Sequence, residues 1–215
     1  MYSGQKIIVS CSYADSIINL RGKLIEGFAK NNEVILITPR IHDKTTWQKL
    51  QEWKVKVFEI ELYPNKFNIL SDLRYLTTLC KIIRKTRPGM YFAYTIKPIC
   101  YGNLAAALCK VKRVSSLFTG LGLMFQNAES ASLLRQLVHR LLKLSLNINK
   151  STTIFFQNDD DRRELLKMQI IGVGFTCVLT SLLGCATNPK FIFFFIKNPR
   201  TINVRINVSS GKKNI

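Results

Sequence analysis

The chain has 215 residues, which is enough for one well-filled α/β domain and short for two. Hydrophobic residues make up 47% and charged residues 21% of it, which argues against global disorder. The 32 Lys and Arg residues outnumber the 13 Asp and Glu residues, giving a net charge of +19. Such an excess predicts an anionic partner: nucleic acid, an anionic membrane surface or a phosphorylated substrate.

The charge is unevenly distributed along the chain. No Asp or Glu occurs between Asp72 and Glu129, and none follows Glu164. The middle of the chain is therefore expected to build a positive surface. Its basic residues are Arg74, Lys81, Arg84, Lys85, Arg87, Lys97, Lys110, Lys112 and Arg113.

Six cysteines are scattered along the chain without a CxxC pair, and only His42 and His139 could join them as ligands. This spacing does not predict a zinc site, and no metal is expected. Only a short apolar run follows Lys6, so no signal peptide is expected. The cysteines are interpreted as reduced residues of a cytosolic protein.

The expected elements alternate between strand and helix from the beginning of the chain. Residues 6–11 (KIIVSC) form a β-branched run that ends in polar residues, the pattern of a buried strand entering a loop. Residues 20–30 have helical spacing of apolar side chains, and residues 33–38 (EVILIT) are the second strand. A short helix at 47–53 and a strand at 56–60 follow.

The same alternation continues through the second half. Ser71 and Asp72 are predicted to cap a helix that runs to Arg87, before Pro88. A strand is expected at 90–94, a helix from Pro98, a strand at 113–118, a helix at 131–149, a strand at 152–157 and a helix capped by Asn158.

Alternating strands and helices predict an α/β fold, a Rossmann-like parallel sheet with helices on both faces. Ligands of such folds bind in loops at the carboxyl ends of the strands. The loops expected there are residues 12–19, 95–98, 119–125 and 157–159.

The first of these loops lacks the G-x-G-x-x-G fingerprint, and Gly120-Leu121-Gly122 is followed by Phe125 where a third glycine would stand. A dinucleotide cofactor is therefore not expected. Two alternatives remain for the glycine pair. It lets backbone N–H groups approach a ligand oxyanion, or it forms a plain tight turn.

The expected helix at 131–149 is amphipathic, with a leucine-rich half opposite a basic half that carries His139. A basic face opposite a leucine face suits a helix at a membrane surface, with Arg135, Arg140 and Lys143 as candidate contacts. The alternative is a helix that packs on the sheet and exposes a solvated basic face. No nucleic-acid motif is present, so nucleic acid is not an expected partner.

Six segments in register resemble the N-terminal domain of family 4 glycosyltransferases that build bacterial surface polysaccharides and lipid-linked oligosaccharides. The resemblance covers residues 5–170 and is carried by SIINLRGKLIE (16–26), LSDLRYL (70–76), YTIKP (94–98), YGNLAA (101–106), TGLG (119–122) and FFQNDD (155–160).

This resemblance implies one half of a two-domain GT-B fold. The N-terminal domain would hold the acceptor, a lipid-linked saccharide, and a C-terminal domain would hold the nucleotide-sugar donor, such as a UDP-sugar. The activity implied is hexosyl or N-acetylhexosaminyl transfer without a metal or other cofactor. Many members act at the inner face of the cell membrane, so a peripheral cytoplasmic location on an anionic membrane surface is expected.

By position, the resemblance implies nine acceptor or cleft contacts. Arg21 and Lys97 are the expected partners of phosphate or sugar hydroxyl groups. The nine residues are Ser16, Asn19, Arg21, Thr95, Lys97, Thr119, Gly120, Gly122 and Asn158.

The resemblance ends near residue 170, so residues 1–170 are predicted to be the glycosyltransferase domain and 171–215 a divergent tail. The tail is interpreted as a truncated or frameshifted start of the donor domain. The competing interpretation takes residues 170–187, an uncharged stretch of 18, as the lower edge of a transmembrane span. Two functions remain open: an enzyme paired with a separately encoded donor domain, or an inactive fragment or membrane-surface binding module without catalysis.

Overall fold

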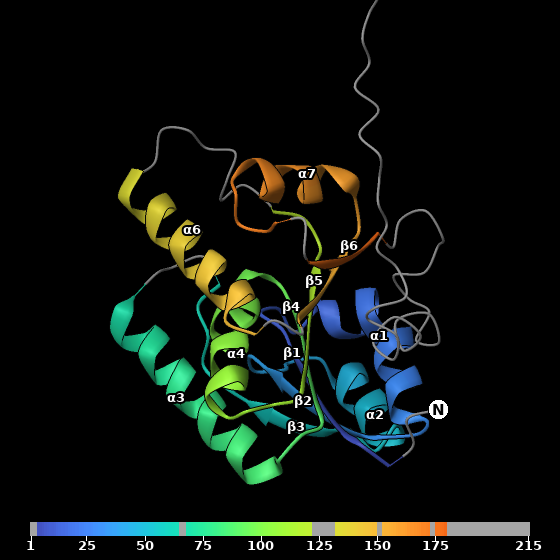
Figure 1. The fold of residues 1–215 in the computed structure, drawn as a ribbon. Coiled ribbons are helices and arrows are strands. Elements are labelled where there is room, and N and C mark those ends of the chain that lie inside the picture. The colour runs from blue at the N-terminus through green and yellow to red at the C-terminus, as the bar shows by residue number, and fades with distance from the viewer. Residues whose placement is uncertain (1–3, 65–67, 122–131, 150–151, 173–174, 180–215) are drawn as a thin grey trace, which may run out of the picture.

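The structure is a computed structural model that describes residues 4–64, 68–121, 132–149, 152–172 and 175–179. Side chains are described throughout these ranges except at residues 132–135. Figure 1 shows a sheet with helices on both of its faces.

The sheet has seven strands in the order β3-β2-β1-β4-β5-β6-β7, and every adjacent pair is parallel. This confirms the predicted Rossmann-like α/β class. The central strands are almost continuously buried because helices cover both of their faces. The strands are β1 (Lys6–Ser10), β2 (Glu33–Thr38), β3 (Lys56–Glu59), β4 (Met90–Tyr94), β5 (Arg113–Phe118), β6 (Thr152–Phe156) and β7 (Thr176–Leu179).

Alternation along the strands separates two apolar cores. On one face, Val9 of β1 packs with Leu24 and Phe28 of the first helix. On the other face, Ile8 shares a core with side chains of α3 (Ile69–Thr86), α4 (Ile96–Leu108) and α6 (Ser132–Asn147). The helices are α1 (Ser16–Ala29), α2 (Lys44–Glu52), α3 (Ile69–Thr86), α4 (Ile96–Leu108), α6 (Ser132–Asn147) and α7 (Asp159–Lys167).

Four helices begin earlier than the sequence pattern predicts, including α2 at Lys44 rather than residue 47 and α4 at Ile96 rather than Pro98. α1 begins at Ser16 rather than at residue 20, because Ile17 is already fully buried in the core. Ser16 and Asn19 therefore lie in a helix and not in the predicted loop. α3 begins at Ile69, and Asn68 caps it by accepting hydrogen bonds from the backbone N–H groups of Leu70 and Ser71.

The last helix agrees with its prediction. The side-chain oxygen of Asn158 accepts a hydrogen bond from the backbone N–H of Asp161 at 2.7 Å, so Asn158 is the N-cap of α7. The three acidic residues of the first turn lie at the positive end of the helix dipole.

Residues of the YGNLAA segment, which carries part of the family resemblance, hold α4 against the sheet. A Cβ atom on Gly102 would lie 1.8 Å from the hydroxyl oxygen of Tyr91, so this position requires glycine for close packing. The side chain of Asn103 donates to the hydroxyl of buried Ser116 at 2.9 Å, which ties α4 to β5. These residues serve the fold of the domain.

β7 lies beyond the predicted domain end at residue 170 and belongs to the same sheet, paired with β6. The described part of the apolar stretch 170–187 thus contains a strand. In the ranges that the structure describes, no helix has both the length and the apolar character needed to cross a membrane.

Candidate functional site

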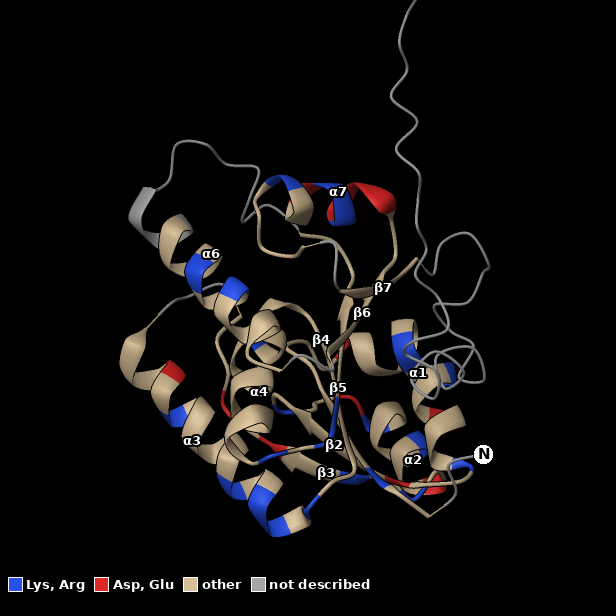
Figure 2. Ribbon diagram, in the orientation of Figure 1, with Lys and Arg blue, Asp and Glu red and all other residues tan. Residues whose placement is uncertain are grey.

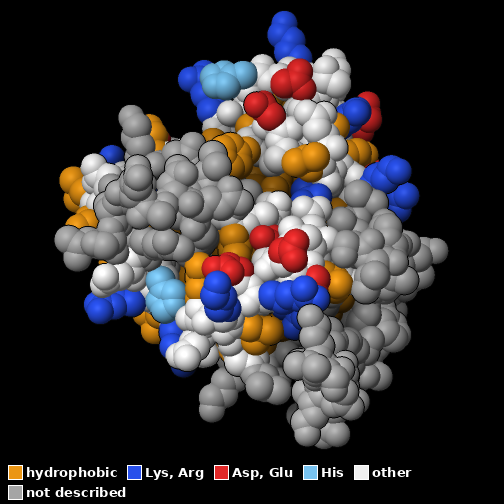
Figure 3. Space-filling model, turned by 90° about the horizontal axis from the view of Figure 1, so that it is seen from above, with side chains coloured by type: hydrophobic (Ala, Val, Ile, Leu, Met, Phe, Trp, Pro, Cys, Tyr) orange, Lys and Arg blue, Asp and Glu red, His pale blue; other side chains and the backbone are white. Residues whose placement is uncertain are grey.

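The strand order reverses between β1 and β4, because β2 lies on one side of β1 and β4 on the other. In open parallel sheets, the carboxyl ends of strands at such a point form the ligand-binding crevice. Ser12 follows β1 here, and Thr95 follows β4 and precedes α4. Figure 3 looks down on this edge, where acidic, basic and apolar side chains are exposed close together.

The hydroxyl group of Thr95 joins the two strand ends. It accepts a hydrogen bond from the backbone N–H of Ser12 at 3.0 Å and donates one to the hydroxyl of Ser12 at 2.8 Å. Ser12 is only 3% exposed, so its polar groups depend on these bonds. The two loops at the reversal point are therefore fixed to each other.

Thr95 also has a backbone conformation that β-branched residues rarely adopt. Its φ of 75° and ψ of 149° lie in a region that glycine usually occupies. Such a conformation costs about 1–3 kcal/mol and persists only where the surroundings enforce it. It occurs here at the amino end of α4, whose first backbone N–H groups favour anionic or hydroxyl oxygens.

A second group of polar side chains lies beside this loop. Ser16 donates to the carbonyl of Tyr13 at 2.6 Å, so the hydroxyl of Tyr94 is the donor in the 3.2 Å bond between Tyr94 and Ser16. Burial raises the pKa of Tyr94 well above its usual range, which keeps the phenol protonated.

The guanidinium carbon of Arg21 lies 5.6 Å from the centroid of the Tyr94 ring, a cation–π arrangement. One nitrogen of Arg21 donates to the carbonyl of Leu20 at 2.8 Å, and Arg21 is only 3% exposed. Burial lowers the pKa of the guanidinium. Its Nε is buried and has no hydrogen-bond partner among the described residues, and a contact of Arg21 with a ligand stays a prediction.

The loop after β5 is tied to the amino end of α7. The backbone N–H of Leu121 donates to the carboxylate of Asp161 at 3.0 Å, and Asn158 donates to the other oxygen of that carboxylate at 3.1 Å. Gly120 has a φ of 124°, which favours glycine, and apart from its chain neighbours no atom of the described residues lies within 4 Å of where its Cβ would be. The turn is thus present, and the close approach of a ligand to it stays a prediction.

The structure brings together only some of the predicted contacts. Ser16, Arg21 and Thr95 surround Tyr94 and the end of β4. Asn19 is exposed on α1, where its side chain donates to the carbonyl of Asp15 at 3.0 Å. Thr119, Gly120 and Asn158 follow the neighbouring strands β5 and β6, and Gly122 lies outside the described residues.

Lys97 is not an exposed cation at the carboxyl edge of the sheet. It is 2% exposed, and its ammonium nitrogen lies 2.6 Å from the carboxylate of Asp72 on α3. Tyr101 donates to the other oxygen of that carboxylate at 3.0 Å. This buried pair joins α3 to α4, and a contact of Lys97 with phosphate stays a prediction.

Sequence reasoning did not select Ser12 or Tyr94 as site residues. Both carried a signal, because Ser12 directly follows the first predicted strand and Tyr94 begins the YTIKP segment. Among the described residues, no group of His, Cys, Asp and Glu side chains is arranged to hold a metal ion.

The exposed face of α6 is not purely basic, as the predicted division into a leucine-rich half and a basic half implied. Leu137 and Leu144 are 50% and 55% exposed, and the exposed cations Arg140 and Lys143 lie beside them. His139 is partly buried, and its ring nitrogen is hydrogen-bonded to the carbonyl of Met168 at 2.8 Å. The side chain of Arg135 lies outside the described residues.

Residues 11–158 match the sequence family described as glycosyl transferase 4-like. The chain belongs to this family. The match contains the reversal point of the sheet, the Ser12–Thr95 contact and the cap of α7. No curated protein matches the chain significantly in sequence.

Solved structures with the same fold include enzymes of sugar-nucleotide chemistry. The UDP-GlcNAc 2-epimerase from Neisseria meningitidis bound to UDP-GlcNAc has a TM-score of 0.57 and 16% identity, covering 91% of this chain and 51% of that chain. A UDP-N-acetylglucosamine 2-epimerase from Rickettsia bellii has a TM-score of 0.56 and 13% identity, covering 94% of this chain and 50% of that chain. A glycosyltransferase from Rickettsia africae ESF-5 has a TM-score of 0.57 and 13% identity, covering 83% of this chain and 43% of that chain.

At these identities the likeness shows the fold alone. The domain spans about half the length of the solved structures that it matches. It therefore has the architecture of one half of a GT-B protein.

Proposed function

We propose that this domain is the acceptor side of a glycosyltransferase that moves a hexosyl or N-acetylhexosaminyl group from a nucleotide sugar, such as a UDP-sugar, to a lipid-linked saccharide. The donor would bind to a second domain, and transfer would occur in the cleft between the two. Family membership supports the reaction class, and the length of the GT-B neighbours supports the need for a second domain.

One observation carries the assignment of the binding edge. Thr95 keeps a strained backbone at the point where the strand order reverses, and its hydroxyl is bound to Ser12. Strain of this kind concentrates at ligand-binding sites, where it holds backbone groups in position. The amino end of α4 then offers N–H groups to phosphate or sugar oxygens.

The exposed face of α6 supports membrane contact at the inner leaflet. Leu137 and Leu144 would enter the interface while Arg140 and Lys143 meet anionic headgroups. Each cation near such a surface contributes about 1 kcal/mol, and the effect weakens with salt. The net charge of +19 acts in the same direction.

The test measures binding of the full chain to lipid nanodiscs that contain a polyprenyl-diphosphate-linked N-acetylglucosamine, with saccharide-free nanodiscs of equal charge as the reference. We expect tighter binding to the saccharide-containing discs. Ser16→Ala and Thr95→Ala should reduce that preference. Thr77→Ala is the matched control, because within the described part of the chain the hydroxyl of Thr77 bonds only the carbonyl of Arg74, on an exposed turn of α3. Equal binding to both kinds of disc contradicts the proposal.

The surface of α6 also favours a second candidate, a membrane-surface binding module without catalysis. It requires the same exposed leucines and cations but no acceptor selectivity. Salt-sensitive binding to anionic vesicles, with no preference for the saccharide, would favour this candidate over the transferase.

A further inference from the structure

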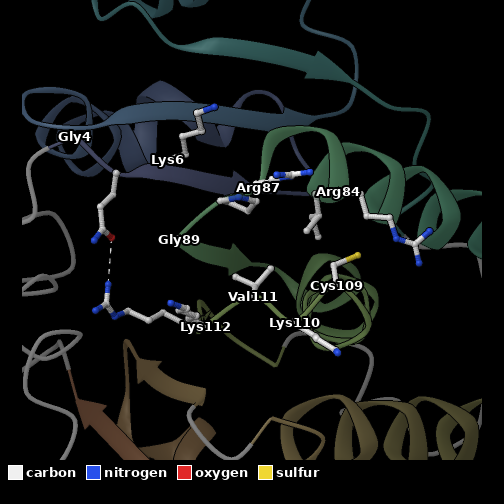
Figure 4. A pocket seen from close by; sticks show the side chains of 13 residues that line it. Gly4, Lys6, Arg84, Arg87, Gly89, Cys109, Lys110, Val111 and Lys112 are labelled. Atoms are coloured by element: carbon white, nitrogen blue, oxygen red, sulfur yellow. Dashed lines mark hydrogen bonds between the residues drawn. The ribbon is translucent and has the colours of Figure 1, made fainter.

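A basic pocket opens at the amino edge of the sheet, opposite the candidate site. Its volume is about 850 Å³. Three chain segments build it, as Figure 4 shows: the start of β1, the link from α3 to β4, and the link from α4 to β5. These segments lie side by side because β1, β4 and β5 are adjacent strands.

The lining combines an apolar floor with a cationic rim. Ile83, Pro88 and Val111 are buried and form the floor. Of the thirteen lining residues none is acidic and six are cationic: Lys6, Arg84, Arg87, Lys110, Lys112 and Arg113. Figure 2 shows Lys and Arg gathered at the lower end of α3.

Local interactions reduce this charge only in part. α3 and α4 end at the pocket, and each helix end carries about half a negative charge, which offsets about one of the six cations. Lys6 lies 3.8 Å from the carboxylate of Glu33, and Arg113 donates to the neutral side chain of Gln5 at 3.1 Å. A strongly positive concave surface remains.

We propose that this pocket binds phosphate groups of an anionic ligand. Guanidinium groups match phosphate oxygens with two parallel hydrogen bonds, and ammonium groups add point charge. The phosphate could belong to an anionic lipid headgroup or to a soluble phosphate compound. The site is separate from the crevice at the carboxyl edge, so the proposal does not depend on the proposed transferase function.

The backbone offers variants that remove charge without straining the fold. Arg87 and Lys110 follow the last turns of α3 and α4 with φ values of 49° and 56°, in the left-handed region that favours glycine. Arg87→Gly and Lys110→Gly should therefore leave the melting temperature nearly unchanged. Lys54 has a φ of 56° after α2 and lies outside the pocket, so Lys54→Gly is a control matched in both charge and backbone.

The experiment measures binding of the full chain and its variants to inorganic pyrophosphate by calorimetry, and to phosphatidylglycerol vesicles by co-sedimentation. Each pocket variant should weaken binding about two- to fivefold, and the double variant more, as expected for partly exposed charge pairs. Lys54→Gly should leave binding unchanged.

The two ligands distinguish the source of the phosphate. If the pocket variants lose only vesicle binding, the phosphate belongs to a lipid headgroup. If they lose pyrophosphate binding, it belongs to a soluble phosphate compound. Binding that falls equally in Lys54→Gly, or that no pocket variant changes, overturns the proposal. The proposal is also overturned if vesicle binding is lost only on neutralising Arg140 and Lys143 while pyrophosphate binding is unchanged in the pocket variants, and the membrane face of α6 then stands alone.

Discussion

Thr95 and Ser12, 83 residues apart in sequence, share two hydrogen bonds across the point where the strand order reverses. The Thr95 hydroxyl accepts from the Ser12 N–H at 3.0 Å and donates to the Ser12 hydroxyl at 2.8 Å. These bonds stabilise a backbone conformation at Thr95 that is itself unfavourable.

The first prediction distinguishes the contribution of the Thr95 hydrogen bonds from the cost of the strained Thr95 backbone. Thr95→Ala loses both hydrogen bonds but keeps the strained φ, so we expect a loss of about 1–3 kcal/mol of unfolding free energy. Thr95→Gly loses the same bonds but relieves the strain, so it should be about 1 kcal/mol more stable than Thr95→Ala. Urea unfolding measures both values. An alanine variant as stable as the glycine variant would show that Thr95 is unstrained.

The second prediction concerns the buried pair of Asp72 and Lys97. Asp72→Ala leaves the Lys97 ammonium buried without its carboxylate and should cost about 3–5 kcal/mol. The double variant Asp72→Leu/Lys97→Met removes both charges and should recover most of this stability. Lys81→Met, at an exposed lysine of α3, controls for loss of a positive charge.

The same double variant tests the predicted binding role of Lys97. If Lys97 only joins α3 to α4, the folded double variant keeps its preference for saccharide-containing nanodiscs. Loss of that preference in a stable double variant would show that Lys97 contacts the acceptor.

The third prediction is a loss of stability in alkali. Burial raises the pKa values of Tyr75, Tyr94 and Cys11, so the folded state retains protons that the unfolded state releases. Their contribution is complete below the unfolded pKa values, about 8.5 for Cys and 10 for Tyr, and is lost as the pH rises above them. The urea midpoint should fall between about pH 9 and 11, and a flat profile would contradict the burial of these groups.

The fourth prediction addresses α6. Arg140→Gln/Lys143→Gln should weaken binding to anionic vesicles about tenfold or more at low salt, and less at high salt. Leu137→Ser/Leu144→Ser should weaken it at both salt concentrations, because apolar insertion is not screened. Lys23→Gln/Lys54→Gln removes two exposed cations elsewhere and should have little effect. If this control loses as much binding as the first pair, net charge rather than α6 determines the affinity.

The strands and the fold class could be predicted from the sequence more accurately than the contacts between side chains. Runs such as EVILIT specify strands through local composition, so the alternation and the α/β class could be inferred directly. The start of α3 could not, because Asn68, Ser71 and Asp72 are all favourable caps and only the fold decides among them. The burial of Asp72 explains why it is not the cap, since its carboxylate binds Lys97.

Long-range effects account for the remaining differences at the site. Nothing near Lys97 in sequence indicates that its ammonium is held by a carboxylate 25 residues away. The strain at Thr95 likewise arises from contacts between separate strands. Residues named by resemblance therefore include both residues at the reversal point of the strand order, such as Thr95, and residues that support the fold, such as Gly102.

The most direct test of the central claim is sugar transfer from a radiolabelled nucleotide sugar to membrane-extracted lipid-linked saccharide. The reaction is measured with this chain alone, with a chain that carries the donor domain of the same family alone, and with both together. We expect turnover only in the mixture, reduced by Thr95→Ala in this chain and unchanged by Thr77→Ala. Turnover by this chain alone would place a donor site within it, and no turnover with any donor domain would contradict an acceptor-side role.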